Sequence, residues 1–212
     1  MPTQIKNIIF DLGGVLLDVD YHKPIEAFEK LGATGFEKVF TQASQARFMS
    51  QFERGEIAPA EFRKEVRRFL PEGVTDYQID EAWNSILGTL PEDRIVLLKM
   101  LKNKGYRLFL LSNTNSIHIK AFQRYLQDSY GPSALERIFE KVYFSSRIGM
   151  RKPSQKVFDF VLRENNLQPE ETFFIDDSEQ HIEGAKKTGI HTHWLREPET
   201  VLDVFKDFPS LH

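Results

Sequence analysis

The chain has 212 residues, a formal net charge of -3, 41% hydrophobic and 28% charged residues, and no cysteine. This composition is typical of a globular protein and gives no reason to expect binding to nucleic acid or to a membrane surface. The lack of cysteine excludes disulfides, thiolate catalysis and cysteine-based zinc sites. No apolar run approaches the ~20 residues that span a bilayer, and the first residues lack a signal architecture, so the expected location is the cytoplasm.

The first apolar run predicts a buried strand that ends at an acidic residue. Ile8, Ile9 and Phe10 form a short continuous apolar segment, which is typical of a strand covered on both faces. Asp11 follows directly, and Gly13-Gly14 allows a sharp turn and a close approach to a ligand. Ligands of open α/β sheets bind at the carboxyl ends of the strands, but a simple Asx turn would give the same pattern.

Between about residues 19 and 90 the apolar residues recur at helical spacing. This spacing predicts several amphipathic helices and almost no strand, with breaks at Gly32 to Gly35, at Gly55 and at Pro71 to Gly73. Pro59 suits the first turn of one of these helices. The predicted organisation is therefore a core of residues 1–18 and 91–212 with residues 19–90 inserted as a helical domain.

From residue 91 onward helix and strand alternate. This alternation predicts an α/β fold with a parallel sheet and right-handed crossovers, and the first strand belongs to the same sheet. We expect helices over 91–104, 117–126, 154–165, 182–188 and 198–208, and strands over 107–111, 142–144, 172–175 and 190–195.

Polar residues stand at the ends of three predicted strands and in one loop. These are Asp11, Ser112-Asn113, Asp176-Asp177 and, in the loop before the helix at 154, Lys152. Each could be a cap, a turn or a surface charge. In one parallel sheet, however, all of them would meet at the same edge, and their joint placement predicts a functional site.

These residue types suit phosphoryl transfer. Asp11 can attack phosphorus and form an aspartyl phosphate. The repulsion between a carboxylate and a phosphate charge is about 4 kcal/mol at 4 Å and an effective dielectric of 20, which a divalent cation and Lys152 would offset. Oxygen ligands from Asp11 and Asp177 suit magnesium, while Ser112 and the following backbone N–H could bind phosphate oxygens.

Four motifs in order resemble the haloacid dehalogenase-like hydrolase superfamily. They are Phe10-Asp11-Leu12-Gly13-Gly14-Val15, Leu111-Ser112-Asn113-Thr114, Arg151-Lys152-Pro153 and Phe174-Ile175-Asp176-Asp177-Ser178. The segment Phe52-Glu53-Arg54-Gly55-Glu56-Ile57 resembles a cap segment of phosphatase-type members.

The resemblance implies a Rossmann-like three-layer core, a mobile α-helical cap and Mg²⁺ as cofactor. It also implies the roles of individual residues. Asp11 would be the nucleophile and a metal ligand, the carbonyl of Gly13 and the carboxylate of Asp177 would be further ligands, and Asp176 would act through water. Ser112 and Lys152 would bind the phosphoryl group, with Asn113 supporting it.

One position departs from the family pattern. Most phosphatases of the superfamily carry a second aspartate two residues after the nucleophile, where this chain has Gly13. Loss of a general acid–base typically costs ~10²–10⁴-fold in rate. The substrate could have a good leaving group, as an anomeric sugar phosphate has; the variant motif, which resembles a bacterial glucose-1-phosphate phosphatase subgroup, favours this explanation. Alternatively, Asp18, Asp20 or His22 could supply the acid, or the site could bind phosphate without turnover.

The expected function is that of a magnesium-dependent phosphatase acting on a small phosphorylated metabolite, most simply a sugar phosphate. A 2-haloacid dehalogenase is the first alternative, and the pair Asp176-Asp177 argues against it because uncompensated carboxylates oppose ionisation of a neighbouring nucleophile. A catalytically silent phosphate-binding regulatory protein is the second. Specificity is expected in the cap, around Phe48, Met49, Phe52 and Glu53.

Overall fold

The computed structural model describes residues 4–34, 47–206 and 208. A five-stranded sheet in the order β3-β2-β1-β4-β5 organises the fold, and every pair of neighbouring strands is parallel. The predicted α/β class with a parallel sheet is therefore confirmed. The strands are β1 (Asn7–Phe10), β2 (Arg107–Ser112), β3 (Lys141–Phe144), β4 (Thr172–Asp176) and β5 (His191–Trp194).

The register of the central strand brings the polar strand ends to one edge. Phe10, the last residue of β1, pairs with Leu110 of β2 and Ile175 of β4. The next residue, Asp11, still donates its backbone N–H to the carbonyl of Ile175 at 3.0 Å. Asp11, the end of β2 and the end of β4 consequently lie side by side.

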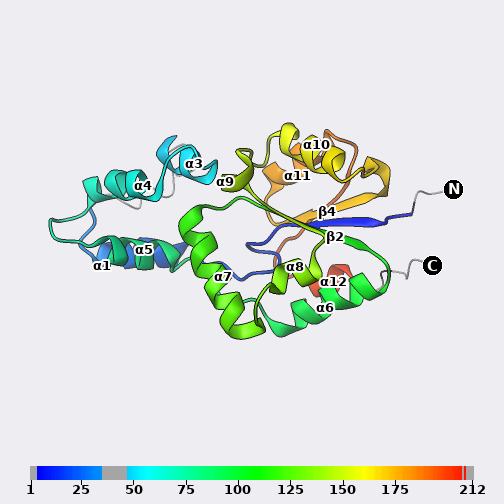
Figure 1. The fold of residues 1–212 in the computed structure, drawn as a ribbon, viewed down its shortest axis with the longest axis horizontal. Helices are drawn as coiled ribbons and strands as arrows, with labels where there is room; N and C mark the ends of the chain where they lie inside the picture. The colour runs from blue at the N-terminus through cyan, green and yellow to red at the C-terminus, as the bar shows by residue number, and fades with distance from the viewer. Residues whose placement is uncertain (1–3, 35–46, 207, 209–212) are drawn as a thin grey trace.

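Helices cover both faces of the sheet, which gives the predicted three layers (Figure 1). Successive strand residues face opposite sides, so Ile8 and Phe10 belong to one buried cluster while Ile9 belongs to the other. The first face is covered by α6 (Glu92–Asn103), α7 (Ser116–Tyr130), α8 (Ala134–Ile138) and α12 (Val201–Val204), and the second by α10 (Gln155–Glu164) and α11 (Glu179–Lys186). Two short elements lie in the connections: α9 (Ser145–Ile148) between β3 and α10, and η2 (Pro169–Glu171) between α10 and β4.

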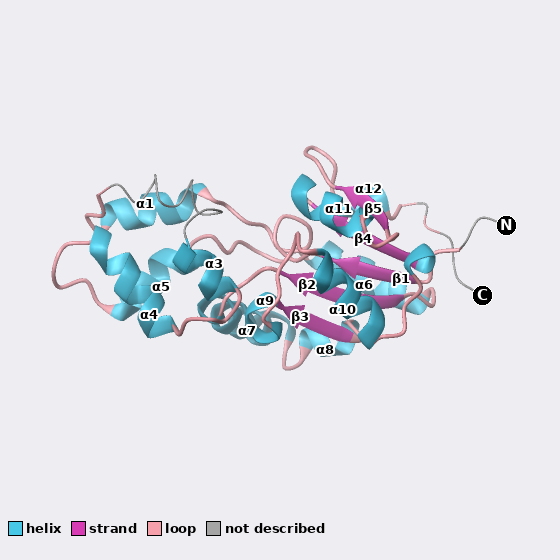
Figure 2. Ribbon diagram, turned by 90° about the horizontal axis from the view of Figure 1, so that it is seen from above, coloured by secondary structure: helices cyan, strands magenta, loops and turns pink. Residues whose placement is uncertain are grey.

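The segment between β1 and α6 forms a separate helical layer beyond the carboxyl ends of the strands (Figure 2). Phe62 lies at the centre of its apolar cluster, stacked on Phe52 at a ring distance of 4.4 Å and 4.9 Å from Trp83. We call α1 to α5 the helical segment; the predicted break at Gly35 lies outside the described residues. Its elements are α1 (His22–Lys30), α3 (Arg47–Glu53), α4 (Pro59–Val66), η1 (Arg67–Phe69) and α5 (Asp76–Asn84).

Four helices differ from the sequence-based expectation. The helix predicted over 117–126 continues to Tyr130. The last helix begins later than predicted because Thr200 and Asp203 form a capping box, which fixes the first turn. The short helices α8 and α9 were not predicted, since four or five residues contain too little periodicity to be recognised. In the described part of the chain, every helix is too short or too polar to cross a membrane.

Candidate active site

The loop after β1 approaches the acidic end of β4 closely. Gly14 has a positive φ of 74°, and a Cβ atom at this position would lie 2.1 Å from Oδ2 of Asp177. A side chain at position 14 would therefore be strained and would collide with the carboxylate. Gly14 is the residue that allows the two motifs to meet.

Lys152 is fully buried between two of the predicted acidic residues. Its Nζ lies 2.7 Å from Oδ1 of Asp11 and 2.6 Å from Oδ2 of Asp176. Asp11 and Asp176 end neighbouring strands, whereas Lys152 comes from the loop before α10. The structure thus brings together three of the residues predicted from separate motifs.

Two contacts hold the loop that carries Lys152. The Asn113 side chain accepts a hydrogen bond from the backbone N–H of Lys152 and donates one to its carbonyl, both at 3.0 Å. On the other side, a Cβ on Gly184 would lie 2.1 Å from the carbonyl oxygen of Pro153, so α11 packs directly on the loop. Asn113, predicted to support the phosphoryl group, uses both amide atoms to position the lysine.

The charges at this edge are not balanced. Burial raises the pKa of Asp11 well above its usual value, and Lys152 offsets only part of this because Asp176 and Asp177 add to the effect. Burial disfavours the charged form of Asp176 as well, but Lys152 and His181 outweigh it and lower the pKa to about 2. Burial and Asp176 raise the pKa of Asp177 to about 6. Three carboxyl groups therefore compete for one ammonium group.

This surplus of carboxyl groups fits a divalent cation. Carboxylate oxygens are the ligands that Mg²⁺ prefers, and its charge would favour the ionised forms of Asp11 and Asp177. The side-chain ligand atoms of Asp11, Asp176 and His181 lie within 4.8 Å of one another. Asp176, however, already accepts hydrogen bonds from the buried lysine and from His181 Nδ1 at 2.9 Å. This occupancy agrees with the expectation that Asp176 acts through water, although Asp11 is paired with Lys152 as well. The assignment of Asp11, Asp177 and the Gly13 carbonyl as metal ligands stays a prediction.

A cavity of about 390 Å³ opens over these residues, between the core and the helical segment. Asp11, Ser112 and Asp177 line its core side, so the predicted nucleophile and phosphoryl ligand face the same space. Met49, Glu53 and the side chains of Trp83, Ile86 and Leu87 line the opposite side.

Only part of the predicted specificity segment reaches the cavity. Met49 and Glu53 line it, whereas Phe52 is buried in the apolar cluster of the helical segment and Phe48 packs against that cluster. The prediction is therefore wrong for Phe48 and Phe52. The reason is the orientation of α3, in which these two side chains point toward Phe62 instead.

Arg151 and Ser145 connect the core to α3. Arg151 Nη2 lies 3.0 Å from Oε2 of Glu53, and Arg151 Nη1 donates a hydrogen bond to Ser50 at 3.1 Å. Ser145 Oγ donates to the carbonyl of Glu53 at 2.6 Å. A Cβ on Gly55 would lie 2.1 Å from the carbonyl oxygen of Ser146, so the turn after α3 sits directly on α9. The helical segment is docked through backbone contacts at this point.

His118 joins α7 to the helical segment from within the cavity wall. Its Nε2 donates to the carbonyl of Trp83 at 3.1 Å, and its Nδ1 accepts from Asn115 at 3.0 Å. Since both ring nitrogens have fixed partners, the ring is held in one neutral tautomer. Burial lowers the pKa of His118 to about 4, which agrees with a neutral ring.

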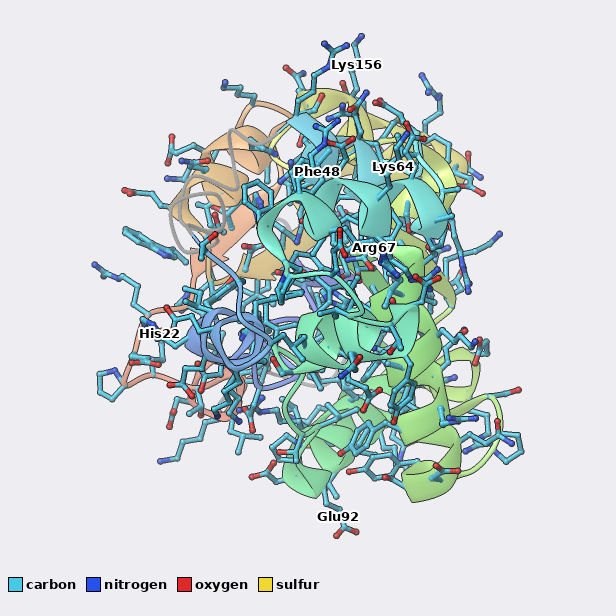
Figure 3. All side chains as sticks on the ribbon, turned by 90° about the vertical axis from the view of Figure 1, so that its left-hand side faces the viewer. His22, Phe48, Lys64, Arg67, Glu92 and Lys156 are labelled. Carbon is cyan, nitrogen blue, oxygen red and sulfur yellow. The ribbon has the colours of Figure 1, made fainter. Side chains whose placement is uncertain are left out.

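The three acids suggested by proximity in sequence do not face the cavity. Asp18 pairs with Arg94 at 2.8 Å, and Asp20 accepts a hydrogen bond from the N–H of His22 at 3.0 Å. His22 is exposed on the outer side of α1 (Figure 3). None of the three is among the described residues that line the cavity, which speaks against the alternative that one of them supplies the missing acid.

Sequence reasoning gave no role to four ionisable side chains that line the cavity: Tyr21, His118, Arg151 and His181. Arg151 stands directly before Lys152 and could have been noticed. His181 lies five residues after Asp176, and a histidine in the first turn of a helix carries no distinctive pattern.

The fold and the site define a class of enzymes with an aspartate at the end of a central parallel strand and a lysine beside it. Residues 5–189 match the family of haloacid dehalogenase-like hydrolases, and the chain belongs to this family. Family membership and the prediction of a hydrolase of the phosphatase type are thereby confirmed, because the curated relatives include phosphatases that match most of this chain.

Two phosphatases and one solved structure are similar to this chain over most of their lengths. The chain is 30% identical over 188 residues to a D-ribitol-5-phosphate phosphatase of Bacteroides thetaiotaomicron, covering 89% of this chain and 90% of the relative. It is 28% identical over 205 residues to a glyceraldehyde 3-phosphate phosphatase of Pyrococcus furiosus, covering 91% and 81%. A crystal structure of a haloacid dehalogenase family enzyme of B. thetaiotaomicron, in complex with magnesium and inorganic phosphate, superposes with a TM-score of 0.86 at 39% identity, covering 95% and 99%.

Proposed function

We propose that this enzyme is a magnesium-dependent phosphatase that hydrolyses a small phosphorylated polyol or sugar through an aspartyl phosphate on Asp11. The observation that carries the proposal is the pair of contacts from the buried Lys152 to Asp11 and Asp176, at the end of a cavity large enough for a small metabolite. The phosphatase relatives and the phosphate-bound structure neighbour support the same reaction.

The residues of the core side would handle the phosphoryl group. Asp11 attacks phosphorus, and the bond between phosphorus and the leaving oxygen breaks. Lys152 pairs with the nucleophile and would neutralise phosphoryl oxygens, while Ser112 lines the same wall as a hydroxyl donor. Asn113 fixes the backbone of Lys152, so this charge does not have to reorganise during the reaction.

Asp11, Asp177 and the carbonyl of Gly13 would hold the magnesium ion. When bound, the ion supplies positive charge that lowers the repulsion between the nucleophile and the phosphate. The surplus of carboxyl groups over Lys152 is what supports this assignment.

The buried polar atoms of Glu53 and Arg151 favour a substrate with several hydroxyl groups. Oε2 of Glu53 and Nε of Arg151 are buried and make no hydrogen bond among the described residues, although the two residues are paired at 3.0 Å. A buried acceptor beside a buried donor suits a hydroxyl group, which can both donate and accept. Glu53 of α3 and Arg151 of the core loop both line the cavity where the helical segment meets the core. The D-ribitol 5-phosphate substrate of one relative has this chemistry.

A substrate panel tests the proposal. Purified protein is incubated with D-ribitol 5-phosphate, D-glucose 1-phosphate, p-nitrophenyl phosphate and a 2-haloacid, each with magnesium and with chelator. Phosphate release is measured for the wild type and for Asp11→Asn. We expect magnesium-dependent release from phosphate esters that Asp11→Asn abolishes.

Two other results would contradict the proposal. Halide release that needs no magnesium would identify a dehalogenase. Binding of a phosphate mimic with magnesium, but no turnover of any ester, would identify a silent binding protein. A preference for D-ribitol 5-phosphate would indicate an ordinary alkoxide leaving group, and a preference for D-glucose 1-phosphate would indicate an anomeric one.

A further inference from the structure

Every second side chain of residues 17–21, which follow the loop after β1, lines the cavity. Leu17, Val19 and Tyr21 line it, whereas Asp18 and Asp20 do not. Residues two apart share a face of an extended chain, and Leu17 and Val19 each form an isolated β-bridge, with Gly13 and Leu87 respectively. Tyr21 follows at the N-cap of α1. The first polar side chain on the cavity face after the loop is therefore that of Tyr21.

Val19 occupies the space beside Gly13. A Cβ on Gly13 would lie 3.2 Å from Cγ1 of Val19, a contact tighter than ordinary packing. The position where related phosphatases begin their acid side chain is thus crowded by Val19, which would have to shift slightly to admit a side chain. Tyr21 is the next residue on that same face.

The Tyr21 hydroxyl lies in the electrostatic field of the site. Burial raises the pKa of Tyr21 above its usual value, and Asp177, Asp11, Asp176 and Glu53 raise it further, in that order. The residue as a whole is 57% exposed, which places it where the cavity meets solvent. The alcohol that leaves a phosphate ester must depart through such an opening.

The other acidic and imidazole groups of the cavity are already engaged. Glu53 is paired with Arg151. His181 Nδ1 is hydrogen-bonded to Asp176 at 2.9 Å, and His118 Nε2 donates to a backbone carbonyl at 3.1 Å. The second ring nitrogens also have partners, since His181 Nε2 lies 3.4 Å from Nδ2 of Asn113 and His118 Nδ1 accepts from Asn115 at 3.0 Å.

Resting on the proposed phosphatase function, we propose that Tyr21 is the catalytic acid–base that replaces the aspartate absent at position 13. As Asp11 attacks, the bond from phosphorus to the leaving oxygen breaks, and the alkoxide takes the phenolic proton of Tyr21 to become the free alcohol. Water then attacks the aspartyl phosphate and gives its proton to the tyrosinate. The bond from phosphorus to Asp11 breaks, which releases inorganic phosphate and restores both residues.

The leaving group decides how much this proton is needed. An alkoxide such as that of ribitol requires protonation, whereas p-nitrophenolate leaves without it. Tyr21→Phe removes only the hydroxyl, and Tyr77→Phe is the matched control because Tyr77 is 71% exposed on α5 and away from the cavity. kcat/KM is measured with D-ribitol 5-phosphate, with p-nitrophenyl phosphate and with a series of aryl phosphates, all with magnesium.

We expect Tyr21→Phe to lower kcat/KM for the ribitol ester by ~10²–10⁴-fold, the usual contribution of a general acid, and for the p-nitrophenyl ester by less than about threefold. Across the aryl series, kcat/KM should also fall more steeply with leaving-group pKa than in the wild type or in Tyr77→Phe. An equal change for both esters, or none, would overturn the role of Tyr21 while leaving the phosphatase intact. A wild type that hydrolyses no ester would instead overturn the proposed function, and the role of Tyr21 with it.

Discussion

A Cβ atom on Gly14 would lie 2.1 Å from Oδ2 of Asp177, so the nucleophile loop and the end of β4 meet only because position 14 has no side chain. We expect Gly14→Ala to lower the free energy of unfolding by more than the ~1–2 kcal/mol of a left-handed non-glycine residue, and to reduce magnesium-dependent turnover. Gly73→Ala is the control, since Gly73 has a φ of 88° and nothing within 4 Å of its Cβ position. Equal losses in denaturant unfolding would show that the close approach is unimportant.

Removal of the buried ammonium should leave two carboxylates without their shared partner. Lys152→Met is expected to abolish turnover and to lower the free energy of unfolding at pH 8 by about 3–5 kcal/mol. The pKa values of Asp11 and Asp176 would then lie above their unfolded values, so the stability of the variant should recover as pH falls toward 5. Lys156→Met, at an exposed residue of α10, provides the control (Figure 3). A variant whose stability declines in parallel with the wild type over this range would contradict the buried triad.

His118 should make stability depend on pH in the opposite sense. Its pKa is lowered to about 4 in the folded protein, whereas an unfolded histidine titrates near ~6.5. The unfolded chain therefore binds the proton first, and about 3 kcal/mol of stability, present above pH 6.5, is lost as pH falls toward 4. Urea unfolding of the wild type and of His118→Gln between pH 7.5 and 4.5 measures the difference. Parallel curves would mean that the imidazole is not held neutral.

Glu53 should matter only for substrates with hydroxyl groups. We expect Glu53→Gln to lower kcat/KM for D-ribitol 5-phosphate by roughly 10- to 100-fold, the range of one hydrogen bond to a charged group, and to leave p-nitrophenyl phosphate within about threefold. Glu56→Gln removes a carboxylate three residues away that pairs with Arg54 at the surface. The hydroxyl-binding role would be refuted by a Glu53→Gln profile that matches the Glu56→Gln profile.

An aspartate at position 13 requires that the Val19 side chain shift or be shortened. Gly13→Asp alone should cost about 1–3 kcal/mol by overpacking against Val19, and Val19→Ala should relieve it. In the double variant we expect faster hydrolysis of alkyl phosphates relative to aryl phosphates, and weaker dependence on Tyr21. Aryl phosphates and sugar 1-phosphates that respond identically would contradict this account of Gly13.

The strand ends could be predicted from the sequence because their signals are local. Continuous apolar runs that stop at Asp11, Ser112 and Asp176 give both the strands and the polar edge, and parallel pairing does the rest. The motif around Lys152 predicted that this residue belongs to the site, but the sequence did not predict that it is buried between two carboxylates. That depends on how the 152–153 loop packs against Gly184, which no local pattern encodes.

The helical segment was less predictable because the placement of its helices against the core depends on contacts between residues distant in sequence. Phe52 and Glu53 are adjacent, yet one enters the cluster and the other lines the cavity, and periodicity alone does not orient α3. Tyr21 is a different case. The alternation Leu17-Asp18-Val19-Asp20-Tyr21 is visible in the sequence and indicates two faces. The acidic candidates Asp18 and Asp20 lie on the face that does not line the cavity, whereas Tyr21 lies on the face that does.

The alternation in that stretch makes its length matter more than its composition. Loss or gain of one residue between Gly14 and Val19 would exchange the two faces, because side-chain direction changes at every residue. Asp18 and Asp20 would then enter the cavity, and Tyr21 would turn to solvent. Natural variants of this enzyme should therefore tolerate substitutions on the outer face while rejecting single-residue insertions and deletions. A deep mutational scan that includes such indels would find the sharpest boundary here, at a loop with no regular secondary structure of its own.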